Sequence, residues 1–313
     1  MTATDATQVA IVGLGKIAVD QHVPSIARSP AFRLAATVSR NARAEGVDAF
    51  ADLTGMLAAR PGITAVALCV PPQVRFAMAR EALVAGRDVL LEKPPGASLA
   101  EVAILSELAA AHDRVLYATW HSRHAAGVGP AKAWLADRRV TRARIVWRED
   151  VRRWHPGQDW IWQAGGLGVF DPGINALSVL TAILPDAVRL RGAELSFPSN
   201  RETPIAARLD LVTASGAEID ADFDWRQTGP QTWDITVETD DGTLELTGGG
   251  ARVRAGGEVL SSAEALASEY DGIYARFAEL IATRRADVDM RPQVLVADAF
   301  MLGRRVVTDA FED

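Results

Sequence analysis

An acid and an amine directly follow a strongly apolar run in this chain. Residues 89–91 (Val-Leu-Leu) are typical of a buried strand, and Pro94 and Pro95 cannot continue a sheet ladder. The strand must therefore end at Glu92 and Lys93. Open α/β sheets bind ligands at the carboxyl ends of their strands, which makes this pair a candidate for ligand chemistry. Charged residues at a strand end are usually just solvated. Whether Glu92 and Lys93 bind a ligand therefore depends on what the rest of the chain provides.

Lysine is rare in this sequence. Among its 33 basic residues only Lys16, Lys93 and Lys132 are lysines, and the first two lie in candidate motifs. A compact amine can change its pKa where a guanidinium cannot. Chance or codon bias explains the pattern equally well.

A second polar pair lies in the sequence Asp171-Pro-Gly-Ile-Asn175. On a helix, residues four apart share a face. A carboxylate can accept a hydroxyl proton, and a neighbouring amide can orient a polyol. The alternative is that Asp171, which precedes Pro172, only caps the helix with proline at its first position.

Tryptophans are concentrated between residues 120 and 162. An indole face packs well against the C–H face of a sugar ring, and Trp154 lies in a segment with little strand or helix pattern. His121, Glu149 and His155 lie close to these tryptophans in the sequence and could hydrogen-bond sugar hydroxyls. For any single tryptophan, filling an interdomain core is an equally good interpretation.

The elements that must position these groups begin at residue 8. Residues 8–18 predict a strand, a glycine turn and a helix, and Gly13 and Gly15 fit the pattern G-x-G-x-x-A. Small residues there let the backbone approach a pyrophosphate at the helix N-terminus. We therefore expect dinucleotide binding at this turn, which also includes Lys16 and Ile17.

The next two strands indicate which dinucleotide is bound. The strand at residues 33–40 ends in Ser39 and Arg40, without the carboxylate that usually holds the ribose 2′-hydroxyl of NAD. A hydroxyl and a guanidinium can bind a 2′-phosphate, so we expect NADP to be preferred, with NAD as a second cofactor. The alternative is that Arg40 is a solvated loop arginine. Pro71 and Pro72 end the third strand where the chain should pass the cofactor.

Strands and helices alternate over residues 1–121 and predict a doubly wound parallel Rossmann domain that binds the dinucleotide. Residues 122–313 predict an α+β domain with a large, mostly antiparallel open sheet, for substrate binding and oligomerisation. Helices are expected at 273–282 and 294–307. The exposed face of such a sheet often pairs with a second copy, so a homo-oligomer is a further expectation.

Composition excludes several classes of protein. The 313 residues carry a net charge of −7, which gives no electrostatic case for nucleic acid or an anionic membrane. The amino end has no signal-peptide pattern, and we expect a cytoplasmic protein. The single Cys69 permits no internal disulfide, and no His, Asp and Glu spacing predicts a metal site.

Several longer motifs resemble the glucose–fructose oxidoreductase / inositol dehydrogenase family (Gfo/Idh/MocA), and within it the bacterial aldose 1-dehydrogenases that act on L-arabinose or D-galactose. The resemblance covers essentially the whole chain. It rests on residues 13–18 (GLGKIA), 71–72 (PP), 92–96 (EKPPG), 119–123 (TWHSR), 149–158 (EDVRRWHPGQ) and 170–175 (FDPGIN).

The resemblance implies oxidation of an aldopyranose at C1 to the aldonolactone, with NADP or NAD accepting the hydride. Lys93 matches the family's active-site lysine, and Asp171 and Asn175 match its catalytic pair. Many members have histidine at the position of Asn175, and an asparagine cannot ionise. We therefore expect Asp171 to be the base, with Lys93 and Asn175 positioning the hydroxyl; Lys93 as the base is the second interpretation.

Two other functions fit the same sequence. The first is a related oxidoreductase that acts on another polyol or carbonyl compound. The second is a catalytically silent regulator that binds NADP, against which the presence of Lys93, Asp171 and Asn175 together argues.

Overall fold

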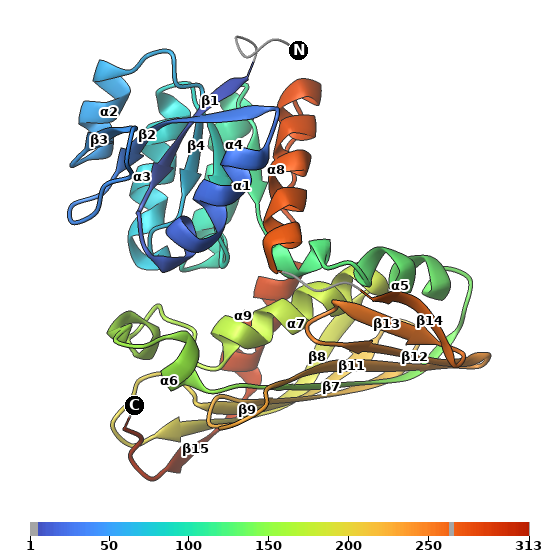
Figure 1. Cartoon of the computed structure of the whole chain (residues 1–313). Coiled ribbons are helices and arrows are strands. Elements are labelled where there is room, and N and C mark those ends of the chain that lie inside the picture. Colours follow the sequence, from blue (N-terminus) through green and yellow to red (C-terminus); the bar gives the residue numbers. More distant parts are fainter. Residues whose placement is uncertain (1–5, 263–265, 313) are drawn as a thin grey trace. The chain divides into compact units, whose positions relative to one another are not determined.

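A computed structural model describes residues 6–262 and 266–312, which form two compact units (Figure 1). The first unit contains residues 1–121 and 266–289, and the second contains residues 122–265 and 290–313. The predicted domains divide the chain once, at residue 121. The structure differs at residues 266–289, which belong to the first unit because the helix there packs into its core.

The first unit is built on a six-stranded parallel sheet. Its strand order is β3-β2-β1-β4-β5-β6, which confirms the predicted doubly wound Rossmann arrangement. The strands are β1 (Thr7–Val12), β2 (Phe32–Val38), β3 (Asp48–Phe50), β4 (Ala65–Leu68), β5 (Asp88–Leu91) and β6 (Leu116–Ala118). The order reverses between β1 and β4, and ligands bind beside the carboxyl ends of the strands at such a switch point.

Helices cover both faces of this sheet. They are η1 (Ala18–His22, a π-helical turn), α1 (Val23–Arg28), α2 (Leu53–Ala59), α3 (Pro72–Val84), α4 (Leu99–Ala111) and α8 (Leu266–Thr283). Helices α2, α3 and α4 pack their apolar sides on one face, and α1 and α8 pack on the other. From α8 the buried side chains include Tyr270, Ile273, Tyr274 and Phe277. A segment far along the chain therefore completes the core of the first unit.

The second unit is built on a nine-stranded sheet in the order β14-β13-β12-β11-β7-β10-β9-β8-β15. All pairs are antiparallel except β7 with β10 and β8 with β15, so the predicted mostly antiparallel sheet is confirmed. The strands are β7 (Val140–Arg148), β8 (Val188–Pro198), β9 (Ala206–Thr213), β10 (Glu218–Asp224), β11 (Thr232–Thr239), β12 (Gly242–Thr247), β13 (Arg252–Ala255), β14 (Glu258–Ser262) and β15 (Arg304–Thr308).

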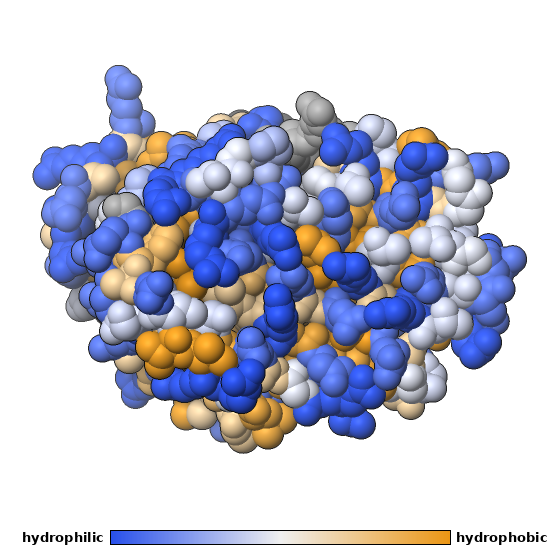
Figure 2. All heavy atoms as spheres, turned by 90° about the horizontal axis from the view of Figure 1, so that it is seen from below, coloured by the Kyte–Doolittle hydropathy of each residue, from blue (hydrophilic) through white to orange (hydrophobic). Residues whose placement is uncertain are grey.

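Helices lie on one side of the nine-stranded sheet (Figure 1). The longer ones are α5 (Val128–Leu135), α7 (Phe170–Ile183) and α9 (Arg291–Leu302), and the short ones are η2 (His121–His124), α6 (Val151–Trp154) and η3 (Asp159–Trp162). On the other side, charged pairs such as Arg142–Asp220 are exposed. Figure 2, seen from below, shows mainly hydrophilic side chains with hydrophobic patches between them.

The predicted helix at residues 294–307 is wrong at its carboxyl end. Helix α9 ends at Leu302, and residues 304–308 pair with β8 as the parallel strand β15. Gly303 turns the chain, with an extended backbone at φ −74° and ψ 138°. A side chain there would clash with the α9 backbone and with Leu195 of β8.

Within residues 6–262 and 266–312, no helix is both long and apolar enough to cross a bilayer.

Candidate functional site

Four neighbouring strands of the first unit, β1, β4, β5 and β6, end at one edge of the parallel sheet. Gly13 follows β1 with a φ of +90°, a conformation that side chains rarely adopt. A Cβ on Gly13 would lie 2.8 Å from both the backbone nitrogen and Cγ1 of Val70. Glycine is therefore required for the end of β1 to lie this close to the end of β4.

The glycine turn has the properties of a pyrophosphate site. A Cβ on Gly15 would meet no protein atom within 4 Å, so the backbone there is open to a ligand. The helical segment begins directly after it, and the Val19 N–H donates to the Gly15 carbonyl at 3.1 Å. Lys16 and Ile17 are exposed in the first turn, and the Lys16 amine forms an ion pair with Asp20. An exposed helix N-terminus of this kind attracts phosphate.

The end of β2 carries the predicted groups for the cofactor's ribose. The Ser39 hydroxyl accepts a hydrogen bond from the Ala42 N–H at 3.3 Å, which folds the loop back on itself. Arg40 is exposed and makes no hydrogen bond or ion pair with any residue that the structure describes. This arrangement is compatible with a 2′-phosphate.

The two prolines place a helix directly after β4. Pro71 precedes α3 and Pro72 is its first residue, where the missing N–H costs no helical hydrogen bond. One turn later, Arg75 is 2% exposed and donates to the carbonyls of Val70, Glu92 and Pro94. Arg75 thus ties the end of β4 to the loop after β5. We did not predict this role, because nothing local distinguishes a buried arginine from a surface one.

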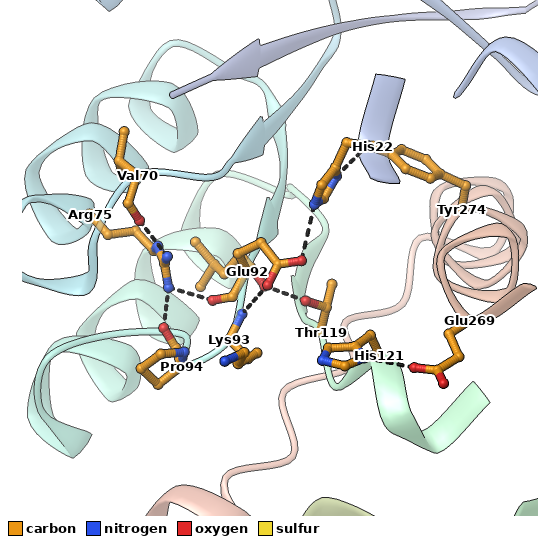
Figure 3. Close-up of polar contacts among 11 residues, drawn as sticks. His22, Val70, Arg75, Glu92, Lys93, Pro94, Thr119, His121, Glu269 and Tyr274 are labelled. Carbon is orange, nitrogen blue, oxygen red and sulfur yellow. Dashed lines mark hydrogen bonds and ion pairs between the residues drawn. The ribbon is translucent and has the colours of Figure 1, made fainter. Parts of the chain in front are cut away.

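Glu92 lies buried at the end of β5, with 4% exposure, between His22 and Lys93 (Figure 3). Its Oε2 accepts the Lys93 backbone N–H at 2.8 Å, and its Oε1 lies 3.0 Å from His22 Nε2. The Lys93 side chain is half-buried. The carboxylate therefore fixes the backbone from which the lysine side chain projects.

Glu92 and His22 form a buried ion pair. Burial alone would raise the pKa of Glu92, but the hydrogen bond and the charge of His22 lower it to about 2. The charges of His121 and Lys93 act in the same direction. Burial alone would lower the pKa of His22, but the polar groups around it raise this pKa well above its ordinary value of 6.5. Those groups include Cys69 as well as Glu92.

His121 is held by α8 rather than by a neighbour in sequence (Figure 3). Its Nδ1 lies 2.7 Å from Glu269 Oε2, and its ring stacks on Tyr270 with centroids 5.5 Å apart. Tyr270 is fully buried, and burial raises the pKa of its hydroxyl well above 10.0. His22, Glu269 and Tyr270 were not predicted, because their partners are far away in the sequence.

In the second unit, Asp171 lies in the first turn of α7 and is 3% exposed. The helix cap is Val169, so Asp171 does not have the capping role that the sequence left open. Its Oδ2 lies 3.3 Å from Nε2 of His155. Gln158 contacts the other ring nitrogen of His155 at 3.4 Å. A buried carboxylate next to an imidazole is a suitable group for accepting a proton.

Asn175 lies one helical turn after Asp171 on α7. Its side-chain oxygen is buried and has no hydrogen-bond partner among the described residues. Buried amide oxygens are normally paired, so an unpaired one indicates a group that a ligand can satisfy. Between them, Gly173 lets the helix pack on Phe223, whose ring carbons would lie 3.1 Å from an added Cβ.

Glu149 is 6% exposed and binds two tryptophans that the sequence did not single out. Its oxygens accept the indole N–H groups of Trp225 at 3.1 Å and Trp233 at 2.9 Å. The Trp225 ring also packs edge-on against His155 at 5.1 Å. Trp154 packs beside Trp233 at 5.7 Å. Glu149 therefore fixes the orientation of Trp225 and Trp233, which together with Trp154 form an aromatic cluster beside His155.

The structure thus divides the predicted residues between the two units. The second unit brings Asp171, Asn175, His155, Trp154 and Glu149 into one region. The first unit holds the others, namely Gly13, Gly15, Lys16, Ile17, Ser39, Arg40, Pro71, Pro72, Glu92, Lys93 and His121. In the part of the chain that the structure describes, no group of three or more His, Cys, Asp or Glu could hold a metal ion.

The chain is similar to several known proteins. The model of an oxidoreductase family with an NAD-binding Rossmann fold, GFO_IDH_MocA, matches residues 7–119. The chain is 43% identical over 305 residues to the galactose 1-dehydrogenase of Pseudomonas fluorescens, covering 97% of this chain and 98% of that protein. The crystal structure of D-galactose-1-dehydrogenase from Rhizobium etli is 52% identical, with a TM-score of 0.94 and 98% of each chain covered. KijD10, a 3-ketoreductase from Actinomadura kijaniata, shares the fold at 17% identity, with a TM-score of 0.84 over 97% of this chain and 99% of that chain.

Proposed function

We propose that this chain, which belongs to the Gfo/Idh/MocA family of oxidoreductases, oxidises the C1 hydroxyl of an aldopyranose to the aldonolactone. The oxidation removes a hydride from C1 and a proton from its hydroxyl, so it needs a hydride acceptor and a base. The observation that carries the proposal is the buried Asp171 carboxylate beside His155, with the unpaired Asn175 oxygen one turn along the same helix. Likeness to two galactose 1-dehydrogenases over nearly the whole chain supports the substrate class.

The hydride acceptor is NADP or NAD. When bound, the dinucleotide supplies the nicotinamide that takes the hydride. The open Gly15 backbone and the helix N-terminus after it would hold the pyrophosphate. Ser39 and Arg40 would bind the 2′-phosphate, so NADP is the preferred cofactor and NAD the second one.

Asp171 is the base that takes the proton from the C1 hydroxyl. His155 lies 3.3 Å from the Asp171 carboxylate and orients it. Asn175 and Lys93 position the sugar and stabilise the negative charge that develops on the oxygen. His121, Trp154 and His155 bind the sugar, and Glu149 contributes by fixing the indoles of Trp225 and Trp233.

The substrate is D-galactose or its close relative L-arabinose. Their pyranoses share configuration at C2, C3 and C4, and galactose adds a hydroxymethyl group at C5. A pocket distinguishes one such small group by about 1–3 kcal/mol, or roughly 10- to 200-fold in kcat/KM.

The test is to incubate the purified protein with NADP or NAD and a panel of aldoses and inositols, and to follow the absorbance of the reduced dinucleotide. We expect D-galactose and L-arabinose to give the highest kcat/KM. A higher kcat/KM for an inositol than for any aldose would show that the proposed substrate class is wrong. Binding of the dinucleotide without reduction by any sugar would indicate a non-catalytic protein.

A further inference from the structure

A buried histidine next to the glycine turn has no part in the reaction as proposed above. His22 is fully buried, although it follows Gly15 by only seven residues. Both of its ring nitrogens have partners, since Nε2 lies 3.0 Å from Glu92 Oε1 and Nδ1 lies 2.8 Å from the Tyr274 hydroxyl (Figure 3). Burying a charged pair is costly, so these groups call for an explanation beyond packing.

We infer that His22 is a positioning residue for Lys93 and acts through the carboxylate of Glu92. The inference deepens the proposed function, because it assigns the support on which the Lys93 side chain depends. It rests on two successive contacts and one backbone connection within the first unit.

The first contact joins Glu92 to the Lys93 backbone. Glu92 Oε2 accepts the Lys93 N–H at 2.8 Å, while Oε1 faces His22. With both oxygens bound, the carboxylate has one orientation. Without His22, the buried Oε1 would lose its donor, and the carboxylate would either rotate or take up a proton. Rotation would break the bond to Lys93, and protonation would weaken it.

The second contact fixes the imidazole itself. The Tyr274 hydroxyl binds Nδ1, and the rings of Tyr270 and Tyr274 stand edge-on to His22, with centroids at 5.0 and 5.8 Å. These contacts hold the ring plane on two sides. The imidazole therefore presents Nε2 to Glu92 in a single direction.

The third link is through the backbone of the helical segment. His22 is the last residue of the π-helical turn η1 (Ala18–His22), and the helical stretch that contains η1 starts at Lys16, directly after the open Gly15. π-Helical turns often occur at functional sites. The same short segment thus carries the expected pyrophosphate site and the imidazole that holds Glu92. The expected pyrophosphate site and the imidazole that fixes Glu92 next to Lys93 are consequently parts of one short helical segment.

The ionisable groups around Glu92 determine how this support depends on pH. His22, His121 and Lys93 bring positive charge to the carboxylate, and Tyr270 and Tyr274 lie beside it on α8. Cys69 lies next to His22, and Glu269 faces His121. Removing His22 deletes the largest contribution that keeps Glu92 ionised. The activity of such a variant should then fall at acid pH values where the wild type remains active.

The activity test compares His22→Gln with His112→Gln, the same change at an exposed histidine after α4. Misplacing a catalytic group by about 1 Å costs roughly 100-fold in rate, so we expect a loss of about that size in kcat for the sugar. The dissociation constant of NADP, measured by fluorescence, should change much less. Wild-type kcat and pH profile in His22→Gln would overturn the inference.

A second readout does not need activity, because the chain has only three lysines. Reductive methylation with ¹³C-formaldehyde labels Lys16, Lys93, Lys132 and any free amino-terminal amine, and keeps their positive charge. Lys93→Arg identifies the Lys93 resonance. We expect His22→Gln to shift this resonance and to leave those of Lys16 and Lys132 in place. A Lys93 resonance that stays at its wild-type position contradicts the inference.

The two hypotheses fail in different ways. If the wild type oxidises no sugar, the proposed function is wrong, while the lysine spectrum still tests the support by His22. If His22→Gln does not fold, Tyr274→Phe and Glu92→Gln replace it, since each keeps the size of the side chain. Both should shift the Lys93 resonance, and an unchanged resonance in Glu92→Gln overturns the inference.

Discussion

At the scale of single residues, the proposed base makes the most direct prediction. Asp171 is buried and has an imidazole partner, so Asp171→Asn would keep the shape and remove the proton acceptor. General base catalysis contributes about 100- to 10,000-fold, and we expect kcat to fall by that amount. NADP affinity should not change. Asp159→Asn, at an exposed aspartate in the same unit, serves as the control, and near-normal turnover in Asp171→Asn would exclude Asp171 as the base.

Arg40 decides the choice of cofactor in the proposed mechanism. Hydrogen bonds to charged groups contribute about 1.5–3 kcal/mol, so Arg40→Ala should weaken NADP binding by at least about 10-fold. NAD affinity should stay constant because NAD has no 2′-phosphate. Titration of both dinucleotides by fluorescence measures the effect. Arg33→Ala, at the opposite end of β2, is the control, and equal NADP and NAD affinities in the wild type would contradict the prediction.

The ion pair of Glu92 and His22 predicts a pH window of stability. The pKa of Glu92 falls from 4.5 to about 2, so its contribution is complete above pH 4.5 and is lost as pH falls towards 2. The pKa of His22 is raised above 6.5, so its contribution is complete below pH 6.5 and is lost as pH rises through the raised value. The pair therefore stabilises the fold most between about pH 4.5 and 6.5.

Denaturant unfolding of Glu92→Gln measures this contribution. We expect a loss of about 3–5 kcal/mol in the window, because one partner of a buried pair remains uncompensated, and a smaller loss at lower pH. Asp220→Asn breaks the exposed Arg142 pair and should cost at most about 1 kcal/mol. If the loss of unfolding free energy in Glu92→Gln does not change with pH, the charge on Glu92 is not the source of this stability.

Sequence reasoning found those site residues that have a local signal. Lys93 follows a buried strand, Gly13 lies in a recognisable glycine turn, and Asp171 is four residues before Asn175 on an expected helix. It missed His22, whose partner Glu92 is 70 residues away. Trp225, which binds Glu149 from 76 residues away, was missed for the same reason. Only the fold brings such pairs together.

At the scale of elements, the segment after β15 supports the region around His155. Asn200 donates to the Phe311 carbonyl at 3.1 Å and accepts the Phe311 N–H at 3.0 Å. Phe311 packs on Trp162 at 6.0 Å and under the guanidinium of Arg152 at 4.8 Å. Arg152 belongs to α6, which His155 directly follows. The segment therefore restrains Arg152 and Trp162, and Trp162 in turn packs on Trp225 beside His155.

Asn200→Ala should release this restraint. Asn200 also donates to Glu312 Oε1 at 3.0 Å, so the substitution removes three hydrogen bonds. Each contributes about 0.5–1.5 kcal/mol, which predicts a measurable loss of stability. We expect a higher KM for the sugar with kcat nearly constant, and faster amide hydrogen exchange in residues 151–162. Asn41→Ala, in an exposed loop of the first unit, is the control. An unchanged KM together with unchanged exchange would disprove the role of this segment.

Many element types followed from periodicity, but some boundaries did not. Helix α8 begins at Leu266, seven residues before the expected start at residue 273, and α9 ends at Leu302 instead of residue 307. The apolar pattern of α9 continues through Val306 and Val307, which is why a helix to residue 307 was expected. Gly303 is the residue at which the helix ends, and a side chain there would meet both the Ala299 carbonyl and Leu195 of β8. A single glycine in a helical pattern does not show whether it ends the helix or continues it.

At the scale of the whole molecule, the chain leaves the first unit and later returns to it. Residues 266–289 supply α8, whose buried Tyr270, Tyr274 and Phe277 face the same core as β1 and β4. The pattern of α8 predicts an amphipathic helix without indicating which sheet it covers. The sequence therefore led to a single boundary at residue 121.

This connectivity predicts how fragments behave. Residues 1–121 alone would leave the α8 side of the sheet exposed, so we expect them to aggregate or to unfold without cooperativity. The same residues joined to 266–289 by a flexible linker of about 15 glycines and serines should fold and bind NADP. Circular dichroism on heating and dinucleotide fluorescence distinguish the two fragments. A stable, NADP-binding fragment 1–121 would show that α8 is dispensable.

The return of α8 also affects the order of events during synthesis on the ribosome. Domains generally fold as units, starting from the amino end while translation continues. Here the first unit lacks the α8 part of one helix layer until residue 289 has left the exit tunnel, and the second unit still lacks α9 and β15. Both units consequently complete their cores only after residue 265 has been synthesised. For most of translation the nascent chain exposes an apolar sheet face of the kind that chaperones bind.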